Sequence, residues 1–549
     1  MKGYEGIAEG LIEEGVETVF GLMAIDNMPF MTHLQRLGMR VVRSRTEHGA
    51  VCMADGYARA TGKPAVVSVG DGPGAGLTGT ALMTAKRRRS PVVLICGDTP
   101  ALERHNIKHF DQNKFFEVTA GHCVDVTDST TLAEDMRRVF EHARSGAGPA
   151  VLNLPLNLFE EGIVGAWNYQ ASTEPQRVRP DLAVAEQAIK MLADAERPII
   201  LAGRGASDGG AKDAILELAE RVGALIGTSM QAETLFEGDP YYLGIIGGLA
   251  NAETLSQVAK ADLILAVGAS LNQFTTDFGR IFPKAHLIHV DRRPTSINHV
   301  TPVDLAVVGE ARATIQEFVR LLDESGTAPR TGLRTEEVRA AIAQSHGPQN
   351  VDYVTKEGVL DPREFLSIVD SAMPDERFIV TDAGHAMFFV FDEIKPHSPD
   401  DRIWGADFAS MMVGIPLGIG TSIARPDKHT VAFVGDGGFM MSIPELDTAV
   451  REQIPMTVIV LNDEAYGAEV HYLENWGLPT DIALFETPDL AAIAASLGCE
   501  SVVVRNREEA EAAVARIGRT DKPYVIDART NIDVIHRLWV GSKRLSGGK

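Results

Sequence analysis

The sequence predicts an α/β protein made of three successive domains with mostly parallel sheets. The chain has 549 residues, which is too long for one domain at roughly 100–200 residues per domain. Short apolar runs alternate with helical patterns and often end in glycine, of which there are 52, as in parallel sheets joined by crossover helices. We expect the domains at residues 1–165, 180–325 and 355–549.

In the first of these regions, apolar residues at helical spacing predict a helix that ends at Gly15. A second helix is expected from Ala50 to Gly62. The basic run at 86–89 is expected at the C-terminal end of a helix, where cations complement the helix dipole; an anion-binding role is the alternative. Runs of β-forming residues predict strands at 19–21, 41–43, 65–69 and 91–96.

Two segments rich in turn-forming residues, 167–180 and 325–353, are expected to connect the domains. Between them, a strand is expected to run from Pro198 into Gly203, and residues 216–222 are expected to be helical. A charged helix is also expected at 507–516. The remaining apolar runs predict strands at 261–267, 285–290, 378–381, 430–434, 456–461, 500–504 and 523–527.

The stretch from Gly435 to Asp463 predicts a strand, a helix with Pro444 near its start, and a second strand. This order places Asp436 and Asp463 at the carboxyl ends of two parallel strands, which is the edge where ligands bind in open α/β sheets. Carboxylate oxygens beside glycines suit a hard cation such as Mg²⁺ or Ca²⁺ that clamps a diphosphate. The alternative is an ordinary crossover with turn residues at both ends.

Composition limits the class of partner. A formal net charge of −23 argues against nucleic acid or an anionic membrane. The four cysteines form no CxxC pair, so neither a disulfide framework nor a zinc site is expected. No apolar run reaches the ~20 residues that span a bilayer, and the start of the chain is amphipathic without an evident signal peptide. We expect a cytoplasmic protein.

Three features together resemble the thiamin-diphosphate enzymes of the acetolactate synthase, pyruvate decarboxylase and benzoylformate decarboxylase superfamily. They are the segment from Arg45 to Arg59, the turn Gly72-Pro73-Gly74, and the 435–463 stretch, in which 24 residues separate Gly437 from Asn462. The resemblance implies a pyrimidine-binding, a central and a diphosphate-binding domain. It also implies a homodimer or homotetramer with active sites at the subunit interface. The family pair Asn-Asn is Asn462-Asp463 here.

The resemblance implies that Glu47 is the catalytic carboxylate that bonds to the cofactor's aminopyrimidine; a first-turn helix carboxylate is the alternative. It implies metal ligation by Asp436, Asp463 and the carbonyl of Ala465. Met411 falls where the family wedges an apolar residue under the cofactor. Core packing, or a register in which Met412 takes this place, are the alternatives.

Further cofactor-binding residues follow from the same resemblance: Gly74, Gly384, His385, Ala409, Gly435, Gly437, Gly438, Tyr466 and Gly467. On the substrate side, catalytic roles are implied for Glu469, which could equally be a solvated helix residue, and for His105 and His109, since histidine carries protons near neutral pH. Lys108 stands where acetolactate synthases carry a glutamine, and His48 replaces the glutamine that commonly follows the activating glutamate.

The implied function is decarboxylation of a 2-oxo acid, followed by aldehyde release or ligation to a second carbonyl compound. One alternative is a FAD-containing 2-oxo acid oxidase, for which Gly203-Arg204-Gly205 is weak support. Another is a 2-hydroxyacyl-CoA lyase-like enzyme, for which Lys543-Arg544 is a slight basic run. A non-catalytic homologue is disfavoured, because Glu47, Asp436 and Asp463 keep suitable oxygens.

Overall fold

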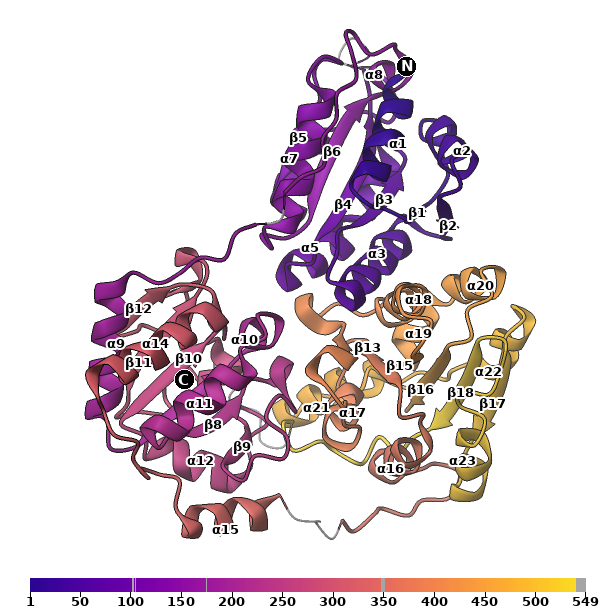
Figure 1. Ribbon diagram of the computed structural model, residues 1–549. Helices are drawn as coiled ribbons and strands as arrows, with labels where there is room; N and C mark the ends of the chain where they lie inside the picture. Colours follow the sequence, from indigo (N-terminus) through magenta and orange to yellow (C-terminus); the bar gives the residue numbers. More distant parts are fainter. Residues whose placement is uncertain (101–102, 104, 174, 347–350, 540–549) are drawn as a thin grey trace. The chain divides into compact units, whose positions relative to one another are not determined.

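A computed structural model of the chain describes residues 1–100, 103, 105–173, 175–346 and 351–539. Within them, the strands form three six-stranded sheets whose described pairings between strands are parallel (Figure 1). The predicted α/β class with three domains is therefore confirmed. The basic run Lys543-Arg544 lies outside the described residues.

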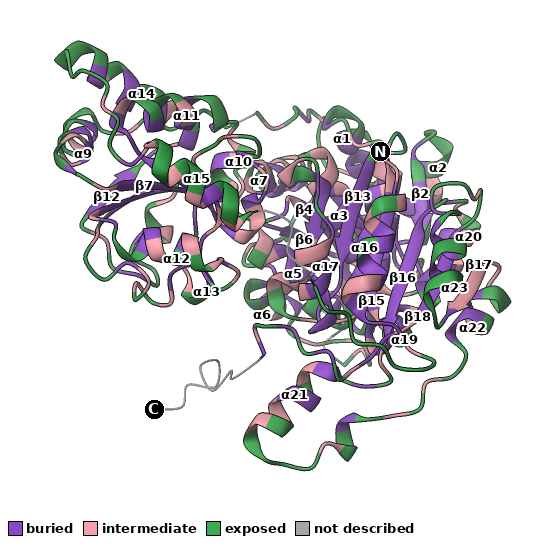
Figure 2. Cartoon of the chain, turned by 90° about the horizontal axis from the view of Figure 1, so that it is seen from below, coloured by how far each residue is buried: buried purple, intermediate pink, exposed green. Residues whose placement is uncertain are grey.

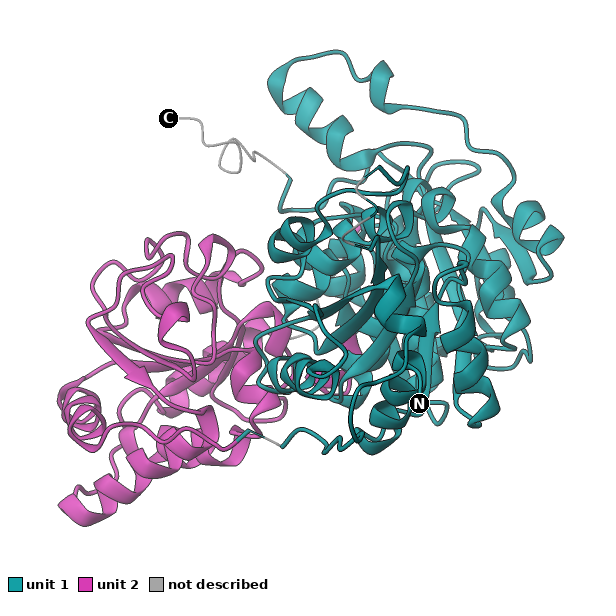
Figure 3. Ribbon diagram, turned by 90° about the horizontal axis from the view of Figure 1, so that it is seen from above, with its two compact units in different colours: residues 1–175, 353–395, 403–549 teal, residues 176–352, 396–402 magenta. Residues whose placement is uncertain are grey.

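The chain divides into two compact units (Figure 3). Unit 1 comprises residues 1–175, 353–395 and 403–549, and it contains the first and third sheets. Unit 2 comprises residues 176–352 and 396–402, and it contains the second sheet. No helix in the described parts of the chain is both long and apolar enough to cross a membrane.

The first sheet has the strand order β2-β1-β3-β4-β6-β5. Its strands are β1 (Thr18–Gly21), β2 (Arg40–Arg43), β3 (Ala65–Val69), β4 (Val92–Asp98), β5 (Cys123–Asp125) and β6 (Ala150–Pro155). Its helices are α1 (Gly3–Glu13), α2 (Met28–Arg36), α3 (Glu47–Thr61), α4 (Pro73–Leu77), α5 (Gly79–Arg88), α6 (Gln112–Thr119), α7 (Leu132–Arg144) and α8 (Leu156–Glu160). The four strands predicted here are confirmed, and α5 ends in the predicted basic turn.

The third sheet repeats this order, counted along the chain, as β14-β13-β15-β16-β18-β17. Its strands are β13 (Arg377–Thr381), β14 (Arg402–Trp404), β15 (His429–Gly435), β16 (Thr457–Asn462), β17 (Glu500–Val504) and β18 (Tyr524–Arg529). Its helices are α16 (Pro362–Ala372), α17 (Ala386–Glu393), α18 (Gly414–Ala424), α19 (Asp436–Ser442), α20 (Pro444–Arg451), α21 (Gly467–Trp476), α22 (Leu490–Ser496) and α23 (Arg507–Val514).

One prediction for the third sheet was wrong in detail. The single helix expected near Pro444 is two helices, and the first of them, α19, begins directly at Asp436. Proline is tolerated at the first position of a helix but not in its interior, so α20 restarts at Pro444. The strand that precedes Asp436 and the strand that precedes Asp463 pair side by side, as predicted.

The first and third sheets share a hydrophobic core within unit 1. Figure 2 shows the strands β13, β15 and β16 almost wholly buried. Helices α3 and α18 pack so closely that their contact leaves no room for a side chain at two glycines. A Cβ at Gly56 would collide with the carbonyl of Leu417, and one at Gly420 with the carbonyl of Met53. Both contacts require glycine.

The second sheet has the order β12-β11-β10-β7-β8-β9. Its strands are β7 (Pro198–Ala202), β8 (Leu225–Thr228), β9 (Tyr242–Ile245), β10 (Leu263–Val267), β11 (His286–Asp291) and β12 (Leu305–Val308). Its helices are α9 (Leu182–Asp194), α10 (Arg204–Asp208), α11 (Lys212–Val222), α12 (Ala252–Ala259), α13 (Gln273–Thr276), α14 (Ala311–Ser325) and α15 (Glu336–Ser345).

Helix α15 corrects the expectation that residues 325–353 only connect domains. The Thr335 hydroxyl accepts a hydrogen bond from the backbone N–H of Val338, which caps the helix, and Ile342 is buried in the core of unit 2. The described part of the other expected connector, 167–180, contains no helix or strand, as predicted.

Candidate active site

Three acidic residues follow three neighbouring strands of the third sheet. Asp382 comes directly after β13, Asp436 after β15 and Asp463 after β16. Because these strands are parallel neighbours, their carboxyl ends meet at one edge of the sheet. Asp382 and Asp436 are buried, and the side chain of Asp463 is only 8% exposed. The structure therefore brings the two predicted carboxylate metal ligands together in a dry environment.

In the described part of the chain, no lysine or arginine forms an ion pair with Asp436 or Asp463. Burial raises the pKa of Asp436 to about 7. Burial, together with the charge of Asp436, raises the pKa of Asp463 well above its ordinary value. His385 Nε2 lies 3.6 Å from Asp463 Oδ2, but burial lowers the pKa of His385 to about 3, so its imidazole is neutral at pH 7. Two uncompensated buried carboxylates fit a divalent cation, because burying charge without a partner is costly.

One carboxylate oxygen of Asp436 has no hydrogen-bond partner among the described residues. Asp436 Oδ1 accepts a hydrogen bond of 2.8 Å from the backbone N–H of Gly437, whereas Oδ2 is buried and has no hydrogen-bond partner in the described part of the chain. No group of three His, Cys, Asp or Glu side chains suited to a metal occurs among the described residues. The predicted set is compatible with this finding, since its third member is the main-chain carbonyl of Ala465.

The glycines at this edge of the sheet serve two purposes. Some leave the backbone accessible, and others allow a neighbouring side chain to pack against it. A Cβ at Gly435 or Gly384 would meet no atom within 4 Å, so a ligand can approach the backbone there. At Gly467, by contrast, a Cβ would collide with the imidazole of His385, and at Gly437 it would lie 2.8 Å from the ring of Tyr466. The predicted cofactor-binding residues at or just after the ends of β13, β15 and β16 thus gather around the two carboxylates.

Met411 lies beside the glycine-rich turn. A Cβ at Gly438 would be 4.0 Å from Met411 Cβ and 2.5 Å from Asp382 Oδ2. The same Asp382 oxygen accepts the backbone N–H of Met412 at 3.1 Å, and Met412 adopts a positive φ of 79°. Nearby Ala409 is exposed. The wedge role of Met411, with Met412 as its rival, stays a prediction.

Glu47 begins helix α3, whose N-terminus is capped by Thr46 Oγ1 accepting the N–H of Gly49 at 2.8 Å. Its carboxylate is half-buried, and burial raises its pKa. A Cβ at Gly74 would lie 3.2 Å from Glu47 Oε1, so the two residues predicted in the first domain are neighbours. No hydrogen bond or ion pair among the described residues joins Glu47 to Asp436.

Sequence reasoning missed the role of Glu445 on α20, which holds the start of α3 in place. Its carboxylate accepts hydrogen bonds from the backbone N–H groups of Arg45 at 3.1 Å and Thr46 at 2.9 Å, and from the Thr46 hydroxyl at 2.8 Å. Glu445 is 2% exposed. An acidic residue on an otherwise apolar helix face was the available signal.

The predicted substrate-side residues are all exposed. Glu469 lies in the first turn of α21, and His105 and His109 lie on the loop that follows β4. None of the three is brought against the Asp436–Asp463 pair by a hydrogen bond within the described residues. Their catalytic roles stay predictions.

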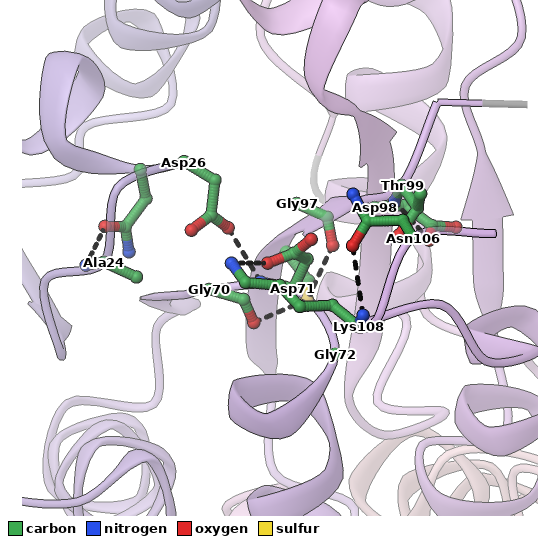
Figure 4. A network of polar contacts seen from close by, with 12 residues as sticks. Ala24, Asp26, Gly70, Asp71, Gly72, Gly97, Asp98, Thr99, Asn106 and Lys108 are labelled. Atoms are coloured by element: carbon green, nitrogen blue, oxygen red, sulfur yellow. Dashed lines mark hydrogen bonds and ion pairs between the residues drawn. The ribbon is translucent and has the colours of Figure 1, made fainter. Parts of the chain in front are cut away.

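A second polar network, unforeseen in the sequence, occupies the corresponding edge of the first sheet (Figure 4). Asp26 Oδ2 accepts the backbone N–H of Asp71 at 2.7 Å, and Lys108 Nζ lies 2.6 Å from Asp71 Oδ1. The detectable signal was the sequence Gly70-Asp71-Gly72 at the end of β3, which repeats Gly435-Asp436-Gly437 at the end of β15.

Comparison with known families agrees with this architecture. The family model "Thiamine pyrophosphate enzyme, N-terminal TPP binding domain" matches residues 1–120, the central-domain model 185–318 and the C-terminal TPP binding domain model 382–528. These matches cover more than half of the chain. The chain belongs to the thiamine pyrophosphate enzyme family.

Similar proteins extend over almost the full length. The acetolactate synthase large subunit of Haemophilus influenzae is 28% identical, covering 93% of this chain and 91% of the relative. The acetolactate synthase isozyme 2 large subunit of Escherichia coli is 27% identical, covering 98% and 97%. The sulfoacetaldehyde acetyltransferase of Alcaligenes xylosoxydans xylosoxydans is 27% identical, covering 94% and 90%.

Proposed function

We propose that this protein is a thiamin-diphosphate- and Mg²⁺-dependent enzyme that decarboxylates a 2-oxo acid. It then releases the aldehyde or ligates the activated aldehyde to a second carbonyl compound. The observation that carries the proposal is the buried pair Asp436 and Asp463, whose pKa values are raised by burial and which has no lysine or arginine partner among the described residues. The names of the relatives, acetolactate synthase and sulfoacetaldehyde acetyltransferase, support a carboligase outcome.

Each predicted residue has a defined task in this proposal. Asp436, Asp463 and the carbonyl of Ala465 would hold the metal ion that binds the diphosphate, and Met411 would pack against the cofactor. Glu47 bonds to the pyrimidine ring and exchanges a proton with it. Burial raises the pKa of this carboxyl. When bound, thiamin diphosphate supplies the nucleophilic carbon and accepts the electrons of the broken C–C bond.

An assembly in which two subunits complete each site is compatible with the structure, because no hydrogen bond or ion pair among the described residues joins Glu47 to the carboxylate pair. We propose a cytoplasmic homodimer or homotetramer, with Glu47 of one subunit facing Asp436 of another. His105, His109 and Glu469 are proposed to move protons at the substrate.

The FAD-containing oxidase gains no support from its proposed turn. A Cβ at Gly203 would collide with the carbonyl of Gly268, and one at Gly205 would lie 2.9 Å from Gly268 Cα. Both glycines therefore have a packing role within unit 2.

The test is to add thiamin diphosphate and Mg²⁺ to the purified protein and to follow CO₂ release and ligation products over a panel of 2-oxo acids. Cofactor-dependent turnover that EDTA abolishes is expected. Absence of both cofactor binding and turnover across the panel would overturn the proposal.

A further inference from the structure

Lys108 and Glu47 lie on opposite ends of one short turn. A Cβ at Gly72 would lie 2.7 Å from Lys108 Cβ and 2.6 Å from its carbonyl oxygen, so Lys108 is packed directly on this residue. Two residues further on, a Cβ at Gly74 would lie 3.2 Å from Glu47 Oε1. Lys108 and the residue proposed to act on the cofactor therefore flank the same Gly72–Gly74 turn.

The ammonium group of Lys108 forms an ion pair with Asp71 and is still partly exposed to solvent. It lies 2.6 Å from Asp71 Oδ1, and the Asp71 side chain is 1% exposed whereas that of Lys108 is 37% exposed. An ammonium group has three N–H donors. Among the described residues, Asp71 is the hydrogen-bond partner of this ammonium group, which leaves two of its donors for a ligand on the exposed side.

Asp71 is itself held by the carboxylate of Asp26, which occupies space beside two glycines. Asp26 accepts the backbone N–H of Asp71, and its oxygens fill the space that side chains at Gly70 and Gly97 would occupy (Figure 4). A Cβ would lie 3.1 Å from Asp26 Oδ1 at Gly70 and 2.6 Å from Oδ2 at Gly97. Lys108 is thus anchored to a rigid group at the sheet edge rather than to a mobile surface acid.

We propose that Lys108, oriented by Asp71, binds the carboxylate of the 2-oxo acid and makes the site selective for an anionic substrate. This inference rests on the function proposed above. In the loops 22–27, 70–76 and 105–111, Lys108 is the sole lysine or arginine, while Asp26, Asp71 and Glu47 are acidic. A substrate carboxylate that approaches this edge would be repelled without the ammonium group.

The experiment compares Lys108→Gln with the matched control Lys114→Gln. Lys114 also pairs with an aspartate, Asp111 at 2.5 Å, but its side chain is 81% exposed. The probes are pyruvate as the anionic donor and acetaldehyde as a neutral acceptor. Lys108→Gln should raise the KM for pyruvate about tenfold or more, with less than a threefold change in kcat or in the KM for acetaldehyde. Lys108→Arg should restore part of the loss, and Lys114→Gln should change nothing.

Measurements of cofactor binding distinguish a failure of the Lys108 assignment from a failure of the proposed function. Thiamin diphosphate affinity and exchange of its C2 proton, measured without substrate, should be the same in Lys108→Gln and wild type. If wild type neither binds the cofactor nor turns over, the proposed function fails. If wild type is active and Lys108→Gln keeps the normal KM for pyruvate, or if it loses cofactor binding, the assignment of Lys108 is overturned. Should Lys108→Gln not fold, Asp71→Asn decides, because it must also raise that KM.

Discussion

The first and third sheets carry the same turn in the same place but balance its charge differently. Both have the same strand order, and in both a Gly-Asp-Gly sequence follows the third strand, at Gly70–Gly72 and at Gly435–Gly437. The residue that faces the turn comes in each case from after the fourth strand. It is Lys108 for Asp71, and a second carboxylate, Asp463, for Asp436.

This difference indicates which of the two turns requires a charge from outside the protein. The first domain neutralises its turn with an internal ammonium group, whereas the third leaves two buried acids that only protons or an external cation can balance. The same strand order thus carries a lysine ammonium group at one turn and, at the other, the carboxylate pair for which we propose a metal ion.

The largest effect is expected from removing a carboxylate of the third-sheet turn. Asp436→Ala should weaken Mg²⁺-dependent binding of thiamin diphosphate by at least about 100-fold, because a hard cation loses a charged ligand. Titration calorimetry measures this loss. Asp71→Asn, in the corresponding turn, is the control and should bind the cofactor normally; equal losses in both variants would contradict the comparison.

Glu47→Gln should lower kcat by about 10²–10⁴-fold, the usual contribution of a positioned acid or base. Steady-state CO₂ release measures the change. Helical content and Mg²⁺-dependent cofactor binding should stay at wild-type levels, since the Thr46 cap and the Glu445 hydrogen bonds do not involve the Glu47 side chain. Near-normal turnover would remove Glu47 from the mechanism.

The metal-free protein should lose stability as pH rises. The pKa of Asp436 is about 7 in the folded state against 3.8 for an ordinary aspartate, so the folded state binds more protons between these values. The free energy of unfolding therefore falls from about pH 4 to pH 7 and levels off above. Asp463→Asn should flatten this slope and raise the melting temperature at pH 8 by a few degrees, roughly, with little change at pH 4.

Cofactor binding provides the control for Asp463→Asn. Because the amide keeps an oxygen at this position, the variant should retain metal-dependent binding of thiamin diphosphate. A melting temperature at pH 8 below that of wild type would show that the two carboxylates do not oppose each other in the fold.

The smallest effect is expected at the first-sheet turn. Lys108→Gln should lower the free energy of unfolding at pH 7 by about 1 kcal/mol, since Asp71 loses its partner but Lys108 is partly solvent-screened. Chemical denaturation measures the loss, and Lys114→Gln should cause none. Added Mg²⁺ should not reverse the loss; full reversal would mean that this turn also accepts a metal.

The strands, and the positions of Asp436 and Asp463 at neighbouring strand ends, were predictable because each is encoded locally. Apolar runs marked the strands, and the interval from Gly437 to Asn462 required a strand, a helix and a strand. Helix α19 was missed because its glycines lower helix propensity, and α15 because a single buried residue, Ile342, anchors a polar segment.

The Asp26–Asp71–Lys108 network was not predictable, since its members are far apart in the chain. The space that Asp26 occupies exists only where Gly70 and Gly97 stand side by side on paired strands. A glycine in a sequence does not reveal whether it serves a turn, a ligand or another side chain.

The glycine contacts between α3 and α18 have a consequence for biogenesis. Gly56 and Gly420 belong to one interface, yet α18 leaves the ribosome long after α3. At about 5–20 residues per second, the apolar face of α3 waits roughly 20–70 s for its partner. The nascent first domain must therefore remain competent to fold while part of its core is open. A truncated chain that ends before α18 would keep this face exposed and is expected to aggregate.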